Sequence, residues 1–320
     1  MPISVIEPIS LALERTRRIL FSPFDARKWF VLGFCAFLAN LMEGGGGNGG
    51  GGNGGGHGRG RGGDLPTSFG GLVDTAWNWL CGNLLIALII GLALILILAV
   101  IVVLTWLKSR GKFMFLDGVV HNRAAVVEPW RRFRHAGNSL IWFYLLFGFF
   151  GCVLVLSMVV GVLALVWPDI VNEEFGTGAV AAIVLGACLF VPMVAALGVI
   201  GLFLDNIVVP TMYLRGLTVW PAWGVFGREI LAAQVGPVIL FCLMRILIRI
   251  AIGVLSVLVC CCTCCVAALP YIGSVILLPL LVFDRCYSVY FLEQFGPSWR
   301  FFADEASPAP TALMTPGGTI

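Results

Sequence analysis

Charge is the property that this sequence has least of. Only 12% of its 320 residues are Asp, Glu, Lys or Arg, whereas soluble proteins have about 25%. Apolar residues make up 59% of the chain, and its mean hydropathy is +0.99. Most of the chain therefore has no water to face, which indicates an integral membrane protein. The net charge of +3 is too small to indicate a nucleic-acid partner.

The motifs of common enzyme classes are also absent from the sequence. There is no His-Glu-x-x-His zinc motif, no Gly-x-Ser-x-Gly nucleophile motif and no Walker A motif. The glycine-rich stretch at 44–63 is not followed by Lys-Ser or Lys-Thr, as a phosphate-binding loop would require. We therefore expect no enzyme activity, no cofactor and no metal site.

Residues 1–28 are charged and predict a cytoplasmic N-terminal region without a cleavable signal peptide, because no long apolar stretch occurs in it. An amphipathic helix on the membrane surface is expected over residues 3–20, and a frayed tail is the alternative. The apolar positions of this helix are Ile6, Ile9, Leu13 and Leu20.

Residues 29–302 are interpreted as an all-α transmembrane domain with six membrane-spanning helices. A span needs about 20 apolar residues, and most of the apolar segments reach this length. The first segment has 14 uncharged residues and is accepted as a span because of the charge distribution. The six predicted spans are 29–42, 84–107, 136–168, 175–204, 250–269 and 271–284.

The distribution of basic residues predicts the orientation. With both termini in the cytoplasm, basic residues concentrate on the inner segments, and only Arg59 and Arg61 lie outside. This agrees with the positive-inside rule and indicates a multi-pass protein of the cytoplasmic membrane of a bacterium. The glycine-rich stretch at 44–63 is then a flexible external linker, and residues 303–320 are a disordered cytoplasmic tail.

A short pattern recurs along the chain and predicts an internal repeat. Three apolar segments end on an aspartate close behind a phenylalanine, at Asp117, Asp205 and Asp284. A tryptophan preceded by a proline follows each of them, at Trp130, Trp223 and Trp299. We interpret each unit as an amphipathic elbow helix in the headgroup layer, where Trp is enriched, followed by a pair of spans. The three units are about 23–117, 129–205 and 221–284.

The start of the chain carries a resemblance to a known group. Residues 13–25, followed by Lys28, Trp29 and Phe30 and a glycine-rich loop, resemble uncharacterised bacterial integral membrane proteins. Helix pairs joined by aromatic elbows are similar to the proteins grouped near the glycerophosphodiester phosphodiesterase membrane domain. The resemblance implies a membrane-embedded helical domain, and the phosphodiesterase itself would be a separate soluble domain for which this chain has no room.

Charged residues inside or beside apolar segments are the candidate sites. Arg245 and Arg249 share a helix face and are expected either to anchor the helix at the interface or to bind lipid phosphate. Asp284 lies within an apolar segment, where an unpaired charge is costly, and we predict an ion pair with Arg249. Its neighbour Arg285 does not face Asp284, because adjacent residues on a helix point in different directions. A proton or ion relay through the three aspartates is the alternative.

Five cysteines cluster within residues 260–265. Small residues that allow close helix packing are the simpler interpretation, and metal or redox chemistry is the alternative. Taken together, the sequence predicts a non-enzymatic membrane module that binds lipids, with anionic headgroups favoured, or a protein partner. A small-molecule or ion transporter or channel, with Asp284 in its pathway, is the alternative function.

Overall fold

The computed structural model describes residues 3–42, 69–171, 176–232, 234–263 and 266–302, and the statements below concern these residues. Every regular element within them is a helix, so the all-α class is confirmed. The glycine-rich stretch, the C-terminal tail and two of the clustered cysteines, Cys264 and Cys265, lie outside the described residues.

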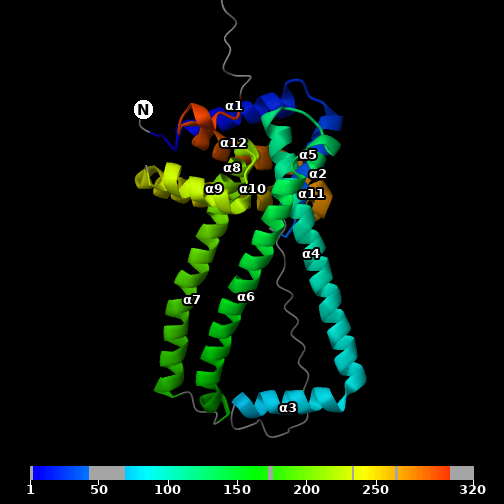
Figure 1. The fold of residues 1–320 in the computed structure, drawn as a ribbon, viewed down its shortest axis with the longest axis vertical. Helices are drawn as coiled ribbons and strands as arrows, with labels where there is room; N and C mark the ends of the chain where they lie inside the picture. The colour runs from blue at the N-terminus through cyan, green and yellow to red at the C-terminus, as the bar shows by residue number, and fades with distance from the viewer. Residues whose placement is uncertain (1–2, 43–68, 172–175, 233, 264–265, 303–320) are drawn as a thin grey trace, which may run out of the picture.

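Three long helices project from a compact group of other helices (Figure 1). They are α4 (Leu84–Val120), α6 (Arg134–Val171) and α7 (Thr177–Phe203). At their far end α3 (Phe69–Gly82) lies across them. We call the compact group at the other end the platform. It contains α1 (Glu7–Phe21), α2 (Ala26–Ala39), α5 (Val127–Arg132), α8 (Val209–Arg215), α9 (Val219–Val225), α10 (Val235–Cys262), α11 (Pro270–Ile276) and α12 (Leu278–Glu293).

Four helices are long and apolar enough to cross a membrane: α4, α6, the continuous stretch Thr177–Arg215 that begins with α7, and α10. In the far half of α4 the apolar side chains are exposed, for example Leu84 at 77% and Leu94 at 61%. Apolar side chains that face away from protein along a whole helix need lipid around them. The expectation of a membrane protein with several membrane-spanning helices is therefore confirmed.

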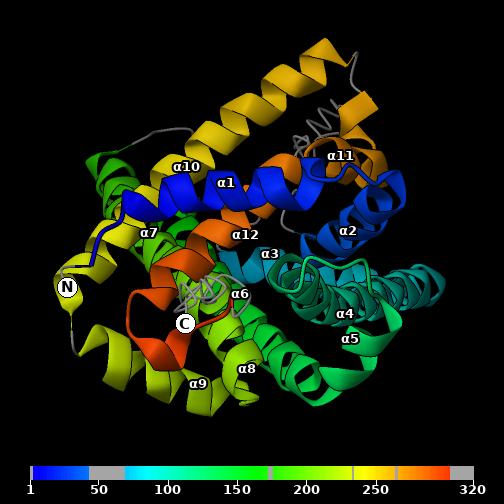
Figure 2. The same ribbon diagram turned by 90° about the horizontal axis from the view of Figure 1, so that it is seen from above.

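Three of the predicted spans coincide with α4, α6 and α7, and the other three segments have a different form. The segment 29–42 forms α2, whose 14 residues extend about 21 Å. The last segment is divided between α11 and α12, which meet at Leu277. Seen from above, α10 lies across the molecule over its full length, whereas α4, α6 and α7 run along the line of sight (Figure 2).

Contact between α2 and α4 fixes one side of the platform. The part of α4 beyond Thr105 is buried, in contrast to its far half. Gly111 on α4 lies directly against the backbone of α2, and a Cβ placed there would be 2.6 Å from the carbonyl carbon of Leu38 and 2.7 Å from the nitrogen of Ala39. Only glycine allows this approach, because the atoms in the way belong to backbone that has no rotamer to change.

We expect Gly111→Ala to destabilise the protein by about 1–3 kcal/mol, the usual cost of overpacking. Gly91→Ala on the same helix is the matched control, because nothing lies within 4 Å of its Cβ position. Thermal unfolding in detergent, followed by circular dichroism, compares the two variants. Equal melting temperatures for both would contradict the contact between α2 and α4.

Candidate functional site

Asp117 is buried at the platform end of α4 and is held by three side chains. Arg123 donates hydrogen bonds to its Oδ2 from Nε at 3.2 Å and from NH2 at 3.0 Å. The hydroxyl of Tyr213 on α8 donates to Oδ1 at 3.0 Å, and His121 Nδ1 lies 3.3 Å from the same oxygen. Asp117 therefore joins α4 to α8 and to the loop before α5.

Asp205 belongs to a π-helical turn, Leu204–Val208, between α7 and α8. Its Oδ1 accepts hydrogen bonds from Lys112 Nζ at 2.5 Å and from the Tyr144 hydroxyl at 2.6 Å. The side chain of Lys112 is 1% exposed, so Asp205 compensates a charge that has no access to water. Arg285 NH1 donates to the backbone carbonyl of Asp205 at 2.9 Å. Helices α4, α6, α7 and α12 thus meet at this residue.

Asp284 on α12 forms an ion pair with Arg245 on α10. Its Oδ1 lies 2.7 Å from Arg245 NH1, and its Oδ2 accepts a hydrogen bond from NH2 at 2.9 Å. Arg245 is fully buried. The predicted partner Arg249 lies one turn further along α10 and is exposed, so the prediction of an Asp284–Arg249 pair is wrong. Arg245 contacts protein and does not face headgroups.

The three tryptophans of the recurring pattern lie on short helices of the platform. Trp130 on α5 makes an edge contact with Trp106 at 5.4 Å, and Trp223 on α9 contacts Phe226 at 5.6 Å. Trp299 on the 3₁₀ turn η4 (Pro297–Trp299) is only 2% exposed. Its indole therefore packs inside the protein, whereas the sequence interpretation places it in the headgroup layer.

A band of aromatic and basic residues surrounds the junction of the long helices with the platform. Trp142 is 74% exposed and Trp220 is 66% exposed. The aromatic members contact one another or a cation: Trp106 with Trp130, Trp220 with Phe143, and Lys108 Nζ above the Tyr144 ring at 4.9 Å. Arg131, Arg132 and Arg134 are exposed at the α5–α6 turn. We call this set the aromatic–basic belt.

The sequence interpretation assigned basic residues to the inner segments but missed three tryptophans of this belt. Trp106, Trp142 and Trp220 lie inside or beside apolar runs. There a tryptophan cannot be distinguished by hydropathy from its apolar neighbours. The signal available for Trp106 and Trp142 was their position, since both lie within a few residues of the platform end of an apolar segment. Trp at the ends of spans is typical of the membrane–water interface.

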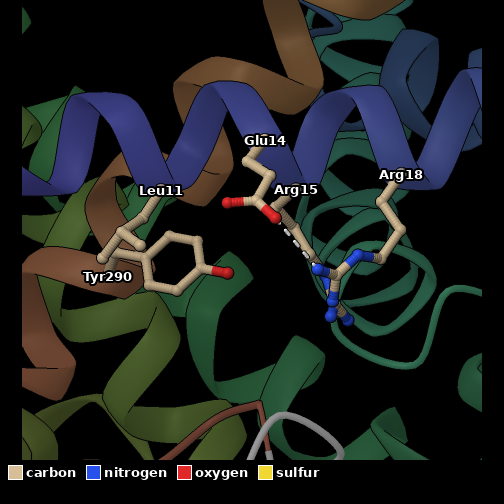
Figure 3. Close-up of a pocket in the computed structure, with 5 residues that line it drawn as sticks. All are labelled: Leu11, Glu14, Arg15, Arg18 and Tyr290. Carbon is tan, nitrogen blue, oxygen red and sulfur yellow. Dashed lines mark hydrogen bonds and ion pairs between the residues drawn. The ribbon is translucent and has the colours of Figure 1, made fainter.

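A pocket of about 270 Å³ lies between α1 and α12, on the side of the platform that faces away from the long helices. Figure 3 shows the guanidinium groups of Arg15 and Arg18 side by side, with the Tyr290 hydroxyl opposite them. Glu14 forms an ion pair with Arg18 at 3.1 Å, and Leu11 completes the lining. The three aspartates of the recurring pattern do not line this pocket.

The end of α10 carries the described part of the cysteine cluster. Cys260 is partly exposed, and Cys261 and Cys262 are exposed. Within the described residues, no group of three His, Cys, Asp or Glu side chains is placed to hold a metal ion. The metal alternative for the whole cluster stays a prediction, because Cys264 and Cys265 lie outside the described residues.

Fold and site together define a helical membrane protein in which apolar helices carry a platform with buried ion pairs. The chain belongs to a family of unknown function, DUF7544, which it matches over residues 3–292. No curated protein and no solved structure shows significant similarity to it. The family match does not link the chain to the glycerophosphodiester phosphodiesterase membrane-domain group, and that resemblance stays an expectation.

We expect Arg245→Met to destabilise the protein by about 3 kcal/mol, because it leaves the Asp284 carboxylate without its cation in a largely buried place. The control Arg249→Met removes an exposed charge from the same helix and changes stability by less than about 0.5 kcal/mol. Chemical denaturation in detergent measures both. A double variant, Arg245→Met with Asp284→Leu, regains most of the lost stability. Equal losses for the two arginines would contradict the pairing.

A second prediction concerns the stability of the protein at low pH. Hydrogen bonds from Arg215 to the Glu229 carboxylate hold the pKa of Glu229 below its ordinary value of 4.5. A carboxyl group whose pKa is lower in the folded state stabilises the fold above the unfolded-state pKa, and this contribution is lost as the pH falls through the folded-state pKa. Glu229 is 42% exposed, so the contribution is small.

We therefore expect the melting temperature to fall below about pH 4.5 more steeply in the wild type than in Glu229→Gln. The pair Arg215–Glu229 joins α8 to the π-helical turn η2 (Phe226–Leu231). Glu7→Gln on α1 makes the same change of net charge and should follow the wild-type profile. Superimposable profiles for the wild type and Glu229→Gln would contradict a stabilising role of this carboxylate.

Proposed function

We propose that this protein is a non-enzymatic membrane module that binds anionic lipid headgroups through its aromatic–basic belt. The observation that carries the proposal is the position of Arg131, Arg132 and Arg134, which are exposed at the α5–α6 turn, about two helical turns before the exposed Trp142 on α6. Exposed apolar side chains continue from this level along the far parts of the long helices. The arginines therefore lie where headgroup phosphates are expected.

The chemistry of the belt favours phosphate. A guanidinium group offers a planar set of donors that matches two phosphate oxygens. Each basic residue close to an anionic membrane surface contributes about 1 kcal/mol of attraction. Indole rings at the same level position the belt, because they prefer the boundary between hydrocarbon and headgroups. Three neighbouring arginines give a local density of positive charge that a zwitterionic lipid does not neutralise.

We propose the orientation in which the platform and both termini face the cytoplasm. The basic residues of α1, α4, α5 and the start of α6 all lie on the platform (Figure 1), and basic residues favour the inner side of a bacterial membrane. The repeat of three units also belongs to this proposal. Support for the repeat comes from the three aspartates, each of which contacts a basic side chain at the platform end.

Transport is the second candidate function, with Asp284 in the pathway. A transporter usually exposes charged groups near the middle of the membrane to a polar cavity. Here both carboxylate oxygens of Asp284 face the guanidinium of Arg245, an arrangement that holds α10 and α12 together. This geometry favours a structural role for the pair, and we therefore prefer lipid binding to transport.

Native mass spectrometry of protein released from nanodiscs that contain phosphatidylglycerol tests the proposal. We expect bound anionic lipid on the wild type and several-fold less on a variant with Arg131, Arg132 and Arg134 changed to serine, because the phosphate ligands are removed. A variant with Arg17, Arg18 and Arg27 changed to serine is the matched control. It loses the same charge from exposed positions on the N-terminal helices and should keep its lipid.

Equal lipid retention by both triple variants would contradict the belt as the site. A wild-type protein that is released without lipid, or that carries another polypeptide in its place, would contradict lipid binding and favour a partner-binding role. Size-exclusion chromatography before the measurement shows whether each variant is folded.

A further inference from the structure

Helix α3 belongs neither to the platform nor to the aromatic–basic belt. It comprises 14 residues, Phe69–Gly82, and lies nearly perpendicular to α4 at the end farthest from the platform (Figure 1). The two helices are separated at Asn83, whose backbone nitrogen donates back to the carbonyl oxygen of Trp79 at 3.1 Å. The non-helical backbone of Asn83, with φ −119° and ψ 63°, is where the chain turns from α3 into α4.

The residues of α3 divide into an apolar side and a polar side. At 100° per residue, Val73, Trp77 and Leu80 fall on one side of the helix, whereas Trp79 falls beside Thr75 on the other side. Val73, Trp77 and Trp79 are 50%, 65% and 54% exposed. The polar side carries Asp74, Thr75 and Asn78. A helix with an apolar side that carries an indole and with a polar side opposite it can lie in the plane of the membrane interface.

The distance between α3 and the belt matches the thickness of a bilayer. Along α4, the 22 residue steps from Leu84 to Trp106 cover about 33 Å. Along α6, the 25 residue steps from Trp142 to Trp167 cover about 37 Å. The hydrocarbon core of a bilayer is about 30 Å thick. The stretch of α4 between Leu84 and Leu104 contains no polar side chain, so nothing in it opposes complete immersion.

We propose that α3 lies flat in the headgroup layer of the leaflet opposite the platform, with Val73, Trp77 and Leu80 directed into the lipid. The bilayer itself contacts the apolar side of α3, because the lipid-facing surface of α4 continues into α3 through Asn83. The protein then has an interfacial anchor in each leaflet, α3 in one and the aromatic–basic belt in the other. This inference does not depend on which lipid the belt binds.

Photo-crosslinking tests the placement. Full-length protein carrying p-benzoylphenylalanine in place of Trp77 is reconstituted into vesicles of phosphatidylethanolamine and phosphatidylglycerol and irradiated. We expect a lipid adduct in a yield similar to that at Leu94, an exposed position near the middle of the stretch of α4 between Leu84 and Trp106. The yield should be several-fold higher than at Asn78 on the polar side of α3, and several-fold higher than at Glu14 on α1. Gel filtration selects folded protein.

Three results would overturn the placement. A crosslink between two copies of the chain at Trp77 would assign this side to a self-association interface. A crosslink to another protein in native membranes would assign it to a partner. Yields at Trp77 equal to those at Asn78 would mean that the apolar side has no contact with lipid.

A second measurement avoids the unnatural residue. Lipids brominated close to the headgroup or close to the chain end quench tryptophan fluorescence according to depth. Changing Trp77 and Trp79 to phenylalanine should remove emission that is quenched mainly by bromine close to the headgroup. If the emission removed is insensitive to bromine at either depth, the indoles lie in water and the proposal fails.

Discussion

Buried charges in this protein are compensated by contacts between helices that are distant in sequence, and the platform depends on those contacts. Lys112 of α4 meets Asp205 at the end of α7, and Arg245 of α10 meets Asp284 of α12. Separating either pair would leave an ion in a low-dielectric environment, at a cost of several kcal/mol. Moving one helix would separate its charge from the partner charge, so the ion pairs oppose a change in the relative positions of the helices.

This constraint also explains the π-helical turn at 204–208. The wider turn coincides with the point where Asp205 accepts hydrogen bonds from Lys112 and Tyr144 while its carbonyl accepts one from Arg285. Asn206 is tied to α12 by the Ser288 hydroxyl at 2.9 Å. A turn of this kind often marks a specialised position in a helix. Here it lets two successive residues bind different neighbours.

Much of the fold could be predicted from the sequence. The rest depends on how the helices pack against one another, which composition does not determine. The segments 84–107, 136–168 and 175–204 were recognised because uninterrupted apolar runs of that length rarely have another explanation. The direction of α10 was not predictable in this way, since hydropathy measures the length of an apolar run and not its angle to other helices. The basic residues Lys108, Arg110 and Lys112 were assigned to a loop, but they lie on the continuous helix α4.

The candidate site was predicted to a similar extent. The three aspartates stood out because each ends an apolar run close behind a phenylalanine, and each has a basic partner in the structure. The partner of Asp284 was misplaced by one helical turn, because Arg245 and Arg249 share a helix face and only the packing of α10 decides which of them is buried. Trp142 and Trp220 were missed because neither their neighbours nor their spacing distinguishes them from residues that face protein.

The continuity of α4 has a mechanical consequence. Its 37 residues form one rod that is clamped by α2 near Gly111 and surrounded by lipid over its far half. For an arm of about 40 Å from Gly111 to Leu84, a tilt of about 5° at the clamp moves the far end by roughly 3.5 Å. Bending or thinning of one leaflet at α3 therefore acts on the buried charges at the opposite membrane surface through a lever, without any chain of side-chain contacts across the bilayer.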